Sequence, residues 1–231
     1  MYYDLHIHSA LSPCSDDDMT LHNIVNMAWI KGLDIIAITD HNSVKQLPYL
    51  PIVAEGKVQF LYGVEIQSRE EVHVLGYFLP NTDLSSIQEF LDQYLIEEPN
   101  DEDYFGHQYI LNEFDEVIGK ESRLLIKSLD LSLKDIIAYI HQFKGIAVLA
   151  HALSERFSIM HNMMTIDPML DFDGIEVTNP QEKKQLLNMF PFLQETMWFI
   201  SSDAHRLEMI SEPKHQLDEK EFYDLWRKRY G

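Results

Sequence analysis

The sequence predicts one α/β domain over residues 1–231, built on a parallel sheet that is most economically a barrel. Buried strand patterns and amphipathic helix patterns alternate about seven times along the chain. Histidine and carboxylate side chains recur at the predicted C-terminal ends of strands, which meet on one face of such a barrel. No internal repeat, low-complexity tract or linker rich in Gly, Ser or Pro interrupts this pattern, so we expect a single domain.

The composition limits the class of partner. The hydrophobic fraction of 45% and the charged fraction of 24% are ordinary for a soluble globular protein. The 18 Lys and Arg residues against 38 Asp and Glu residues leave a formal net charge of -20. Such a surface repels the nucleic-acid backbone and anionic membranes unless cations or a local basic pocket offset it. We therefore expect a small phosphorylated substrate, consider long nucleic acid unlikely and expect no membrane partner.

The single cysteine, Cys14, cannot form a disulfide within the chain, which indicates a reducing compartment. No basic segment followed by an apolar one opens the sequence, and no apolar run approaches the roughly 20 residues of a membrane helix. The expected location is cytoplasmic, and the oligomeric state is left open. Cys14 itself is interpreted as a free loop thiol rather than a ligand.

The first predicted strand, Tyr3 to His8, carries two histidines two residues apart. Strand alternation places His6 and His8 on one face, with Leu5 and Ile7 on the other. This is a metal-ligand spacing, although a hydrogen-bonded histidine pair on a half-buried strand would look the same.

The following elements are predicted from apolar periodicity and capping residues. Thr20 caps a helix that closes at Gly32. The later predicted elements are the strand 34–39 with Asp40 and His41 at its end, the strand 58–66 with Glu65, the strand 71–78 with His73, and the helix 83–95.

Residues 96–130 break the alternation and are predicted to be a short acidic and helical insertion or lid within the domain. The acidic run at 97–103 is interpreted as a solvated loop. Phe105, Tyr109 and Phe114 are expected to pack inward.

The C-terminal part resumes the alternation. Ser132 caps a helix that ends at Gly145. The further predicted elements are the strand 146–150 before His151, the strand 174–177 before Asn179 with Glu176 on it, the strand 197–201 before Asp203 and His205, and the helix 218–230.

Six of the eleven histidines fall at these strand ends or on the strand with His73. A mixture of imidazole and carboxylate suits zinc, manganese or iron. More than four such ligands on one face indicate a multinuclear site, in which Glu65 can bridge two ions. Paired ions about 3.5 to 4 Å apart activate hydroxide and stabilise charge on a phosphoryl oxygen.

Five motifs in order resemble those of the PHP (polymerase and histidinol phosphatase) family of metal-dependent phosphoesterases. They are Asp4-Leu5-His6-Ile7-His8-Ser9, Ile38-Thr39-Asp40-His41-Asn42, Gly63-Val64-Glu65-Ile66, Ala150-His151 and Ser202-Asp203-Ala204-His205. The resemblance implies a distorted, TIM-like barrel of seven β/α units that holds three divalent ions.

The resemblance also implies a ligand set. One ion takes His6, His8, Glu65 and Asp203; a second shares Glu65 with His73 and His151; the third takes Asp16, His41 and His205. Asp16 is chosen from Asp16-Asp17-Asp18 by counting back from the helix start. The implied catalytic residues are Glu65, Asp203 and Arg156, and the guanidinium of Arg156 would bind the phosphate group. The pair Arg156-Phe157 stands two residues later than the corresponding Arg-Tyr pair of the family.

Four further residues have weaker assignments. Arg206 adjoins two proposed ligands and is either a second phosphate contact or a surface residue. Asp40 is interpreted as a residue behind the ligands that orients them. Glu176 and Asn179 are interpreted as residues that either orient the ligands from behind or contact the substrate, with a structural role as the alternative.

The expected function is metal-dependent hydrolysis of a phosphate ester by metal-activated hydroxide. The substrate is expected to be a small phosphomonoester or a nucleotide (bis)phosphate. The alternatives are an exonuclease on short oligonucleotides, a non-catalytic metal-binding PHP module, and C–N bond hydrolysis on an amidohydrolase-like barrel.

Overall fold

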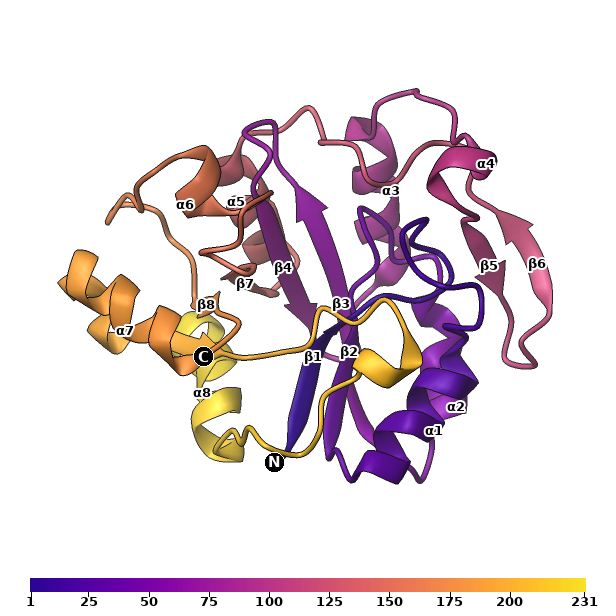
Figure 1. The fold of residues 1–231 in the computed structure, drawn as a ribbon, viewed down its shortest axis with the longest axis horizontal. Coiled ribbons are helices and arrows are strands. Elements are labelled where there is room, and N and C mark those ends of the chain that lie inside the picture. Colours follow the sequence, from indigo (N-terminus) through magenta and orange to yellow (C-terminus); the bar gives the residue numbers. More distant parts are fainter.

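A curled sheet of seven strands forms the centre of the molecule in the computed structural model, which describes residues 1–231 (Figure 1). The strand order is β1-β2-β3-β4-β7-β8-β9. The strands are β1 (Tyr3–Ile7), β2 (Ile35–Ile38), β3 (Gln59–Gln67), β4 (His73–Phe78), β7 (Ile146–Leu149), β8 (Gly174–Glu176) and β9 (Met197–Phe199). The predicted α/β class is confirmed, and most strand pairings are parallel.

One strand of this sheet, β4, runs opposite to its neighbours. It pairs antiparallel with both β3 and β7, whereas the other four pairings are parallel. Only residues 68–72 separate β3 from β4, and a parallel return needs a crossover of about a dozen residues or more. The prediction of a wholly parallel sheet is therefore wrong at β4, and no helix separates β3 from β4. Because β4 is reversed, its first residue, His73, lies at the edge where the parallel strands end.

The two ends of the curled sheet approach each other at that same edge. The segment after β9 forms an isolated parallel bridge from Ala204 to Ile7 of β1. The N–H of His8 donates to the carbonyl of Ala204 at 2.9 Å, and the N–H of Ala204 donates to the carbonyl of His6 at 3.1 Å. The segment with Asp203 and His205 is thereby fixed beside β1.

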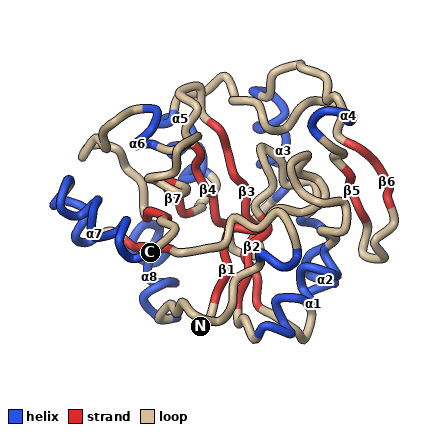
Figure 2. The backbone as a smooth tube through the Cα atoms, in the orientation of Figure 1, coloured by secondary structure: helices blue, strands red, loops and turns tan.

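Helices surround the sheet (Figure 2). They are α1 (Leu21–Lys31), α2 (Leu50–Ala54), α3 (Leu84–Tyr94), α4 (Glu102–Phe105), α5 (Leu133–Gln142), α6 (Ile159–Asn162), α7 (Pro180–Met189) and α8 (Glu219–Tyr230), with 3₁₀ turns at Leu47–Tyr49, Pro191–Glu195 and Leu207–Met209. None of the helices is both long enough and apolar enough to cross a membrane.

Side-chain caps define the helix ends that the sequence predicts. Thr20 accepts the N–H of Asn23, and Gly32 ends α1 with a left-handed φ of 77°. Ser132 starts α5 in the same way. The periodicity does not predict α7, because only Leu186 of its side chains is buried.

Two apolar clusters lie on the two faces of the sheet. The larger has 43 buried residues, and the smaller has 14 and includes Phe222 and Trp226 from α8. Leu5 belongs to the smaller cluster and Ile7 to the larger, because the pairing of β1 with β2 shifts register between Asp4 and Ile7. The strict alternation expected for Leu5 and Ile7 is therefore wrong.

Residues 96–130 contain a β-hairpin beside the main sheet. The strands β5 (Tyr109–Leu111) and β6 (Val117–Lys120) pair antiparallel, and the only helix in the segment is the short α4. Phe114 is 73% exposed, so its expected inward packing is wrong. The cause is the turn between the strands, where Asn112 Oδ1 accepts the N–H groups of Phe114 and Glu116 and directs Phe114 outward.

Candidate metal centre

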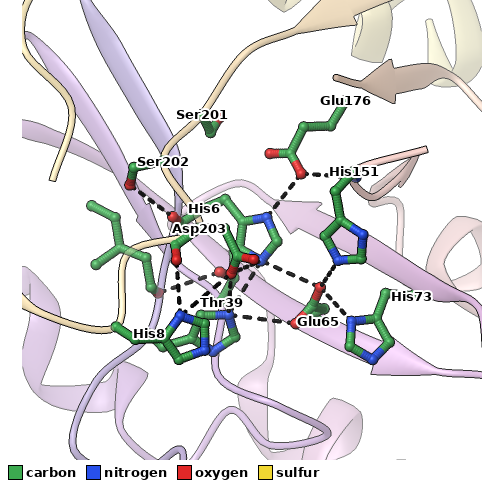
Figure 3. Close-up of polar contacts among 12 residues, drawn as sticks. His6, His8, Thr39, Glu65, His73, His151, Glu176, Ser201, Ser202 and Asp203 are labelled. Atoms are coloured by element: carbon green, nitrogen blue, oxygen red, sulfur yellow. Dashed lines mark hydrogen bonds and ion pairs between the residues drawn. The ribbon is translucent and has the colours of Figure 1, made fainter. Parts of the chain in front are cut away.

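Eight of the nine predicted ligands converge at the edge of the sheet where β4 begins and the other strands end. They are His6, His8, His41, Glu65, His73, His151, Asp203 and His205. Figure 3 shows His6, His8, Glu65, His73, His151 and Asp203 at this edge. A cavity of about 460 Å³ opens onto this cluster. Besides six of the ligands, its lining comprises Cys14, Gln67, Ile126, Ser154, Glu155, Arg156 and Phe157.

Glu65 lies at the centre of the cluster and is 1% exposed. Its Oε1 lies 2.8 Å from His73 Nδ1, 3.2 Å from His151 Nε2 and 3.3 Å from His6 Nε2. Its Oε2 lies 3.0 Å from His41 Nδ1 and 3.4 Å from His8 Nε2. One carboxylate thus presents each oxygen to a different set of imidazoles, which is the arrangement a bridging ligand requires.

The spacing of His6, His8 and Asp203 fits a tetrahedral ion. The two Nε2 atoms are 3.2 Å apart, and each lies 3.3 Å from Asp203 Oδ1. Ligands about 2.0 to 2.1 Å from a tetrahedral zinc ion are about 3.3 to 3.4 Å from one another. Two further groups of donors lie close together, His8 with His41 and His205, and His41 with Glu65 and His73. The residues therefore fit divalent ions.

The second nitrogen of four imidazoles is held by a hydrogen bond, as is usual for histidine ligands of metals. His6 Nδ1 donates to Glu176 Oε2 at 2.9 Å, and His8 Nδ1 donates to Ser12 Oγ at 3.1 Å. His73 Nε2 lies 3.2 Å from Gln67 Oε1, and His205 Nδ1 lies 2.8 Å from the carbonyl of Asp203. These bonds leave the other nitrogen of each ring free for a metal.

Asp40 and Glu176 lie behind the ligands and hydrogen-bond the ligands or the groups that hold them. Asp40 accepts the N–H and hydroxyl of Ser9 and the hydroxyl of Ser12, which in turn contacts His8. Glu176 accepts from His6 and from the backbone N–H of His151.

The third predicted residue of this kind, Asn179, does not reach the cluster. Its side chain caps α7 and hydrogen-bonds only Thr178, Gln181 and Glu182. In the structure Asn179 is therefore the N-terminal cap of α7.

Positive and negative groups balance each other inside the cluster. Burial by itself raises the pKa of Glu65, but His73, His6 and His41 outweigh burial and hold it well below the usual value. Burial lowers the pKa of His6, yet Glu176, Asp203 and Glu65 together raise it well above the usual value. The carboxylates therefore attract protons onto neighbouring imidazoles, and divalent ions would supply the same positive charge.

The ninth predicted ligand, Asp16, lies outside the cluster. Its side chain is 53% exposed, and its Oδ2 lies 3.5 Å from Arg206 Nε. Arg206 is itself 60% exposed and does not line the cavity. Arg156 does line the cavity, is exposed and has no ion-pair partner.

Six cavity residues were not among the predicted site residues, and three of them contact or adjoin the ligands. Cys14 lies beside His41 and His205; burial raises its thiol pKa, but these two imidazoles outweigh burial and lower it to about 6. Phe157 stacks on His73 at 5.0 Å, with 4° between the ring planes. Gln67 follows Glu65 by two residues on β3, a spacing that identifies it in retrospect as facing the same side.

The fold is an α/β domain whose sheet edge carries a cluster of histidines and carboxylates suited to divalent metal ions. The PHP domain model matches residues 4–167, so the chain belongs to the PHP domain family. This confirms the resemblance drawn from the sequence motifs. No match is found among curated proteins.

Solved structures share this fold at low sequence identity. A protein from Bifidobacterium adolescentis, assigned as a metal-dependent phosphoesterase, has a TM-score of 0.68 and 18% identity over 98% of this chain and 96% of its own. An amidohydrolase from Chromobacterium violaceum with bound sulfate has a TM-score of 0.65 and 17% identity over 99% and 97%.

The lesion-specific endonuclease Q of Pyrococcus furiosus has a TM-score of 0.63 and 20% identity over 89% of this chain. The match covers 48% of the endonuclease, so this chain spans about half of its length.

Proposed function

We propose that the protein hydrolyses a small phosphate ester, either a phosphomonoester or a nucleotide (bis)phosphate. The observation that carries the proposal is the cluster of eight predicted ligands, with Glu65 at its centre, beside a cavity that also contains an unpaired guanidinium, that of Arg156. Divalent ions bound there would lower the pKa of an attacking water and neutralise phosphoryl oxygens.

The metal assignment is part of the same proposal. We propose three divalent ions, zinc, manganese or iron, because the donors form three close groups. Glu65 would bridge ions, and Asp203 would complete the tetrahedral group with His6 and His8. Glu176, together with Ser12 and Asp40, would keep the imidazoles of His6 and His8 in the orientation for binding.

The cavity wall supports a small organic phosphate as substrate. Arg156 would grip a phosphoryl group through two parallel hydrogen bonds. Ile126 and Phe157 offer an apolar surface in the same cavity, suited to the organic part of the ester. The net charge of -20 disfavours long polyanions.

Residues 96–130 are proposed to be an insertion in the domain. The cytoplasmic location stays a prediction.

The test measures bound metal first and turnover second, on the full chain. The substrate panel contains phosphomonoesters, nucleotide bisphosphates, and short and long oligonucleotides. Asp203→Ala is expected to lower turnover by more than about 100-fold, because it removes a ligand and not merely its support. Asp103→Ala, the same change at an exposed position, serves as the matched control.

Each outcome separates the alternatives. Bound metal without turnover on any substrate would favour the non-catalytic module. Fastest turnover on short oligonucleotides would favour the exonuclease, and fastest turnover on long strands would contradict the charge argument. Full activity in Asp203→Ala would refute the assigned site.

A further inference from the structure

The imidazoles of His8, His41 and His205 form a group of donors that lacks a negatively charged ligand of its own. Their ligand atoms lie within 4.8 Å of one another. The resemblance assigns Asp16 to this position, but the carboxylate of Asp16 faces Arg206 and does not line the cavity. Glu65 lies 3.0 Å from His41 and Asp203 lies 3.6 Å from His205, but both carboxylates are already assigned to the ion of His6 and His8. A further anion would therefore help to balance the charge of a second buried ion.

Cys14 lines the cavity beside this group, whereas Asp16 does not. The Cys14 side chain lines it together with His41 and His205. It is the only cysteine in the chain, so a disulfide within the chain cannot account for it.

The loop that carries Cys14 is held in place by contacts on both sides of it. Ser12 is buried and donates to Asp40 at 2.7 Å. On the other side, the N–H of Asp16 donates to the carbonyl of His205 at 3.0 Å. These bonds place the thiol at the metal cluster and direct the Asp16 side chain to the surface.

A residue outside this loop reinforces its position. Gly106 lies so close to Pro13 that an added Cβ would be 2.2 Å from the Pro13 carbonyl oxygen. Gly106 also has a φ of 100°, which other residues rarely adopt. The backbone of Gly106 therefore packs against Pro13, the residue before Cys14.

We propose that Cys14 is the anionic ligand of the ion held by His41 and His205, in place of Asp16. The ligand set at this position is then one thiolate with imidazoles, and binding releases the thiol proton. Soft thiolate ligands favour zinc or iron, whereas carboxylates suit manganese and magnesium. This position would therefore prefer zinc or iron(II) over manganese. The inference rests on the proposed metal centre but not on the identity of the substrate.

The test uses cobalt(II) as a spectroscopic probe of the metal-free full chain. Thiolate ligation produces a near-ultraviolet charge-transfer absorption, and Cys14 is the only residue of the chain that can give it. Wild-type protein is expected to develop this band as cobalt binds. Cys14→Ser is expected to lose the band and to bind one ion fewer per chain, while Asp16→Asn keeps both the band and the full count.

A second measurement does not depend on any variant. Bound zinc is expected to protect Cys14 from alkylation by iodoacetamide, measured by mass spectrometry. The proposal is overturned if cobalt or zinc does not bind, if bound cobalt gives no band, or if Asp16→Asn loses an ion while Cys14→Ser does not. A band with no turnover on the substrate panel would refute the phosphoesterase proposal alone, and turnover without a band would refute only the role of Cys14.

Discussion

At the scale of single residues, Glu176 links two ligands from different strands. Its Oε2 accepts from the His6 ring at 2.9 Å and from the His151 backbone at 3.0 Å, and the side chain is buried. A carboxylate behind a histidine ligand fixes the orientation of the ring and raises its basicity. Glu176 is therefore a positioning residue for the proposed metal centre.

Replacing Glu176 tests this role. Glu176→Ala is expected to weaken metal affinity by about 10- to 100-fold, because the His6 ring loses its hydrogen-bond acceptor. Glu176→Gln keeps an acceptor oxygen and is expected to lose less. Affinity is measured by competition with a chromophoric chelator, and Glu195→Ala, at an exposed position, is the control. Wild-type affinity in both Glu176 variants would show that His6 does not need this partner.

At the scale of elements, a buried amide joins the two ends of the β5–β6 hairpin. Gln108 is fully buried, and its Nε2 donates to the carbonyls of Glu121 and Arg123 at 2.8 Å each. Its Oε1 accepts the N–H of Leu125 at 2.9 Å. A single side chain thus satisfies three backbone groups of the segment that returns from the hairpin.

Loss of the Gln108 side chain leaves these backbone groups without partners. Gln108→Ala is expected to lower the free energy of unfolding by about 2 kcal/mol or more, since each unsatisfied buried group costs about 1 to 3 kcal/mol. Urea unfolding followed by circular dichroism measures the change. Gln93→Ala, on the exposed side of α3, is expected to change it by less than about 0.5 kcal/mol. Equal stability of the two variants would mean that water replaces the Gln108 bonds.

The helices and strands also show which parts of the fold can be predicted from the sequence. The strands and capped helices follow from local patterns. The eight proposed ligands follow from their positions on or after strands together with the resemblance to the PHP motifs. The reversed direction of β4 depends on the length of one connection, and the hairpin turn depends on the side chain of Asn112.

Loop residues were harder to predict because tertiary contacts fix their side chains. The choice between Cys14 and Asp16 depends on Gly106, about 90 residues away in sequence, and on Arg206. No periodicity in the loop itself contains that information.

At the scale of the whole molecule, the proposed ligands come from β1, from β3 and β4, and from the segments after β2, β7 and β9. Ions bound there would link the first strand to the last segment of the sheet, which otherwise meet through the bridge between Ile7 and Ala204. Binding to the native state alone stabilises it by mass action. Removal of metal is therefore expected to lower the stability of the entire fold.

This stabilisation is expected to grow as the pH rises from about 7 to about 9. In the metal-free protein His6 and His41 have raised pKa values: burial lowers both, but the carboxylates around His6, and Cys14 and Glu65 around His41, outweigh it. Their protonation stabilises the fold below the unfolded pKa of about 6.5, and this contribution is lost as pH rises through the raised values. His8 has a lowered pKa, through burial and the neighbouring His41 and His205, and is already neutral in this range.

Metal binding requires the same imidazoles to be neutral, so protons compete with the ions more strongly at lower pH. The difference in Tm between metal-loaded and chelator-treated protein is therefore expected to be larger at about pH 9 than at about pH 7. Thermal unfolding by calorimetry at the two pH values measures it, with ionic strength held constant. A difference that stays constant or shrinks with pH would show that the carboxylates do not hold protons on His6 and His41, and that the charge balance inferred for the cluster is wrong.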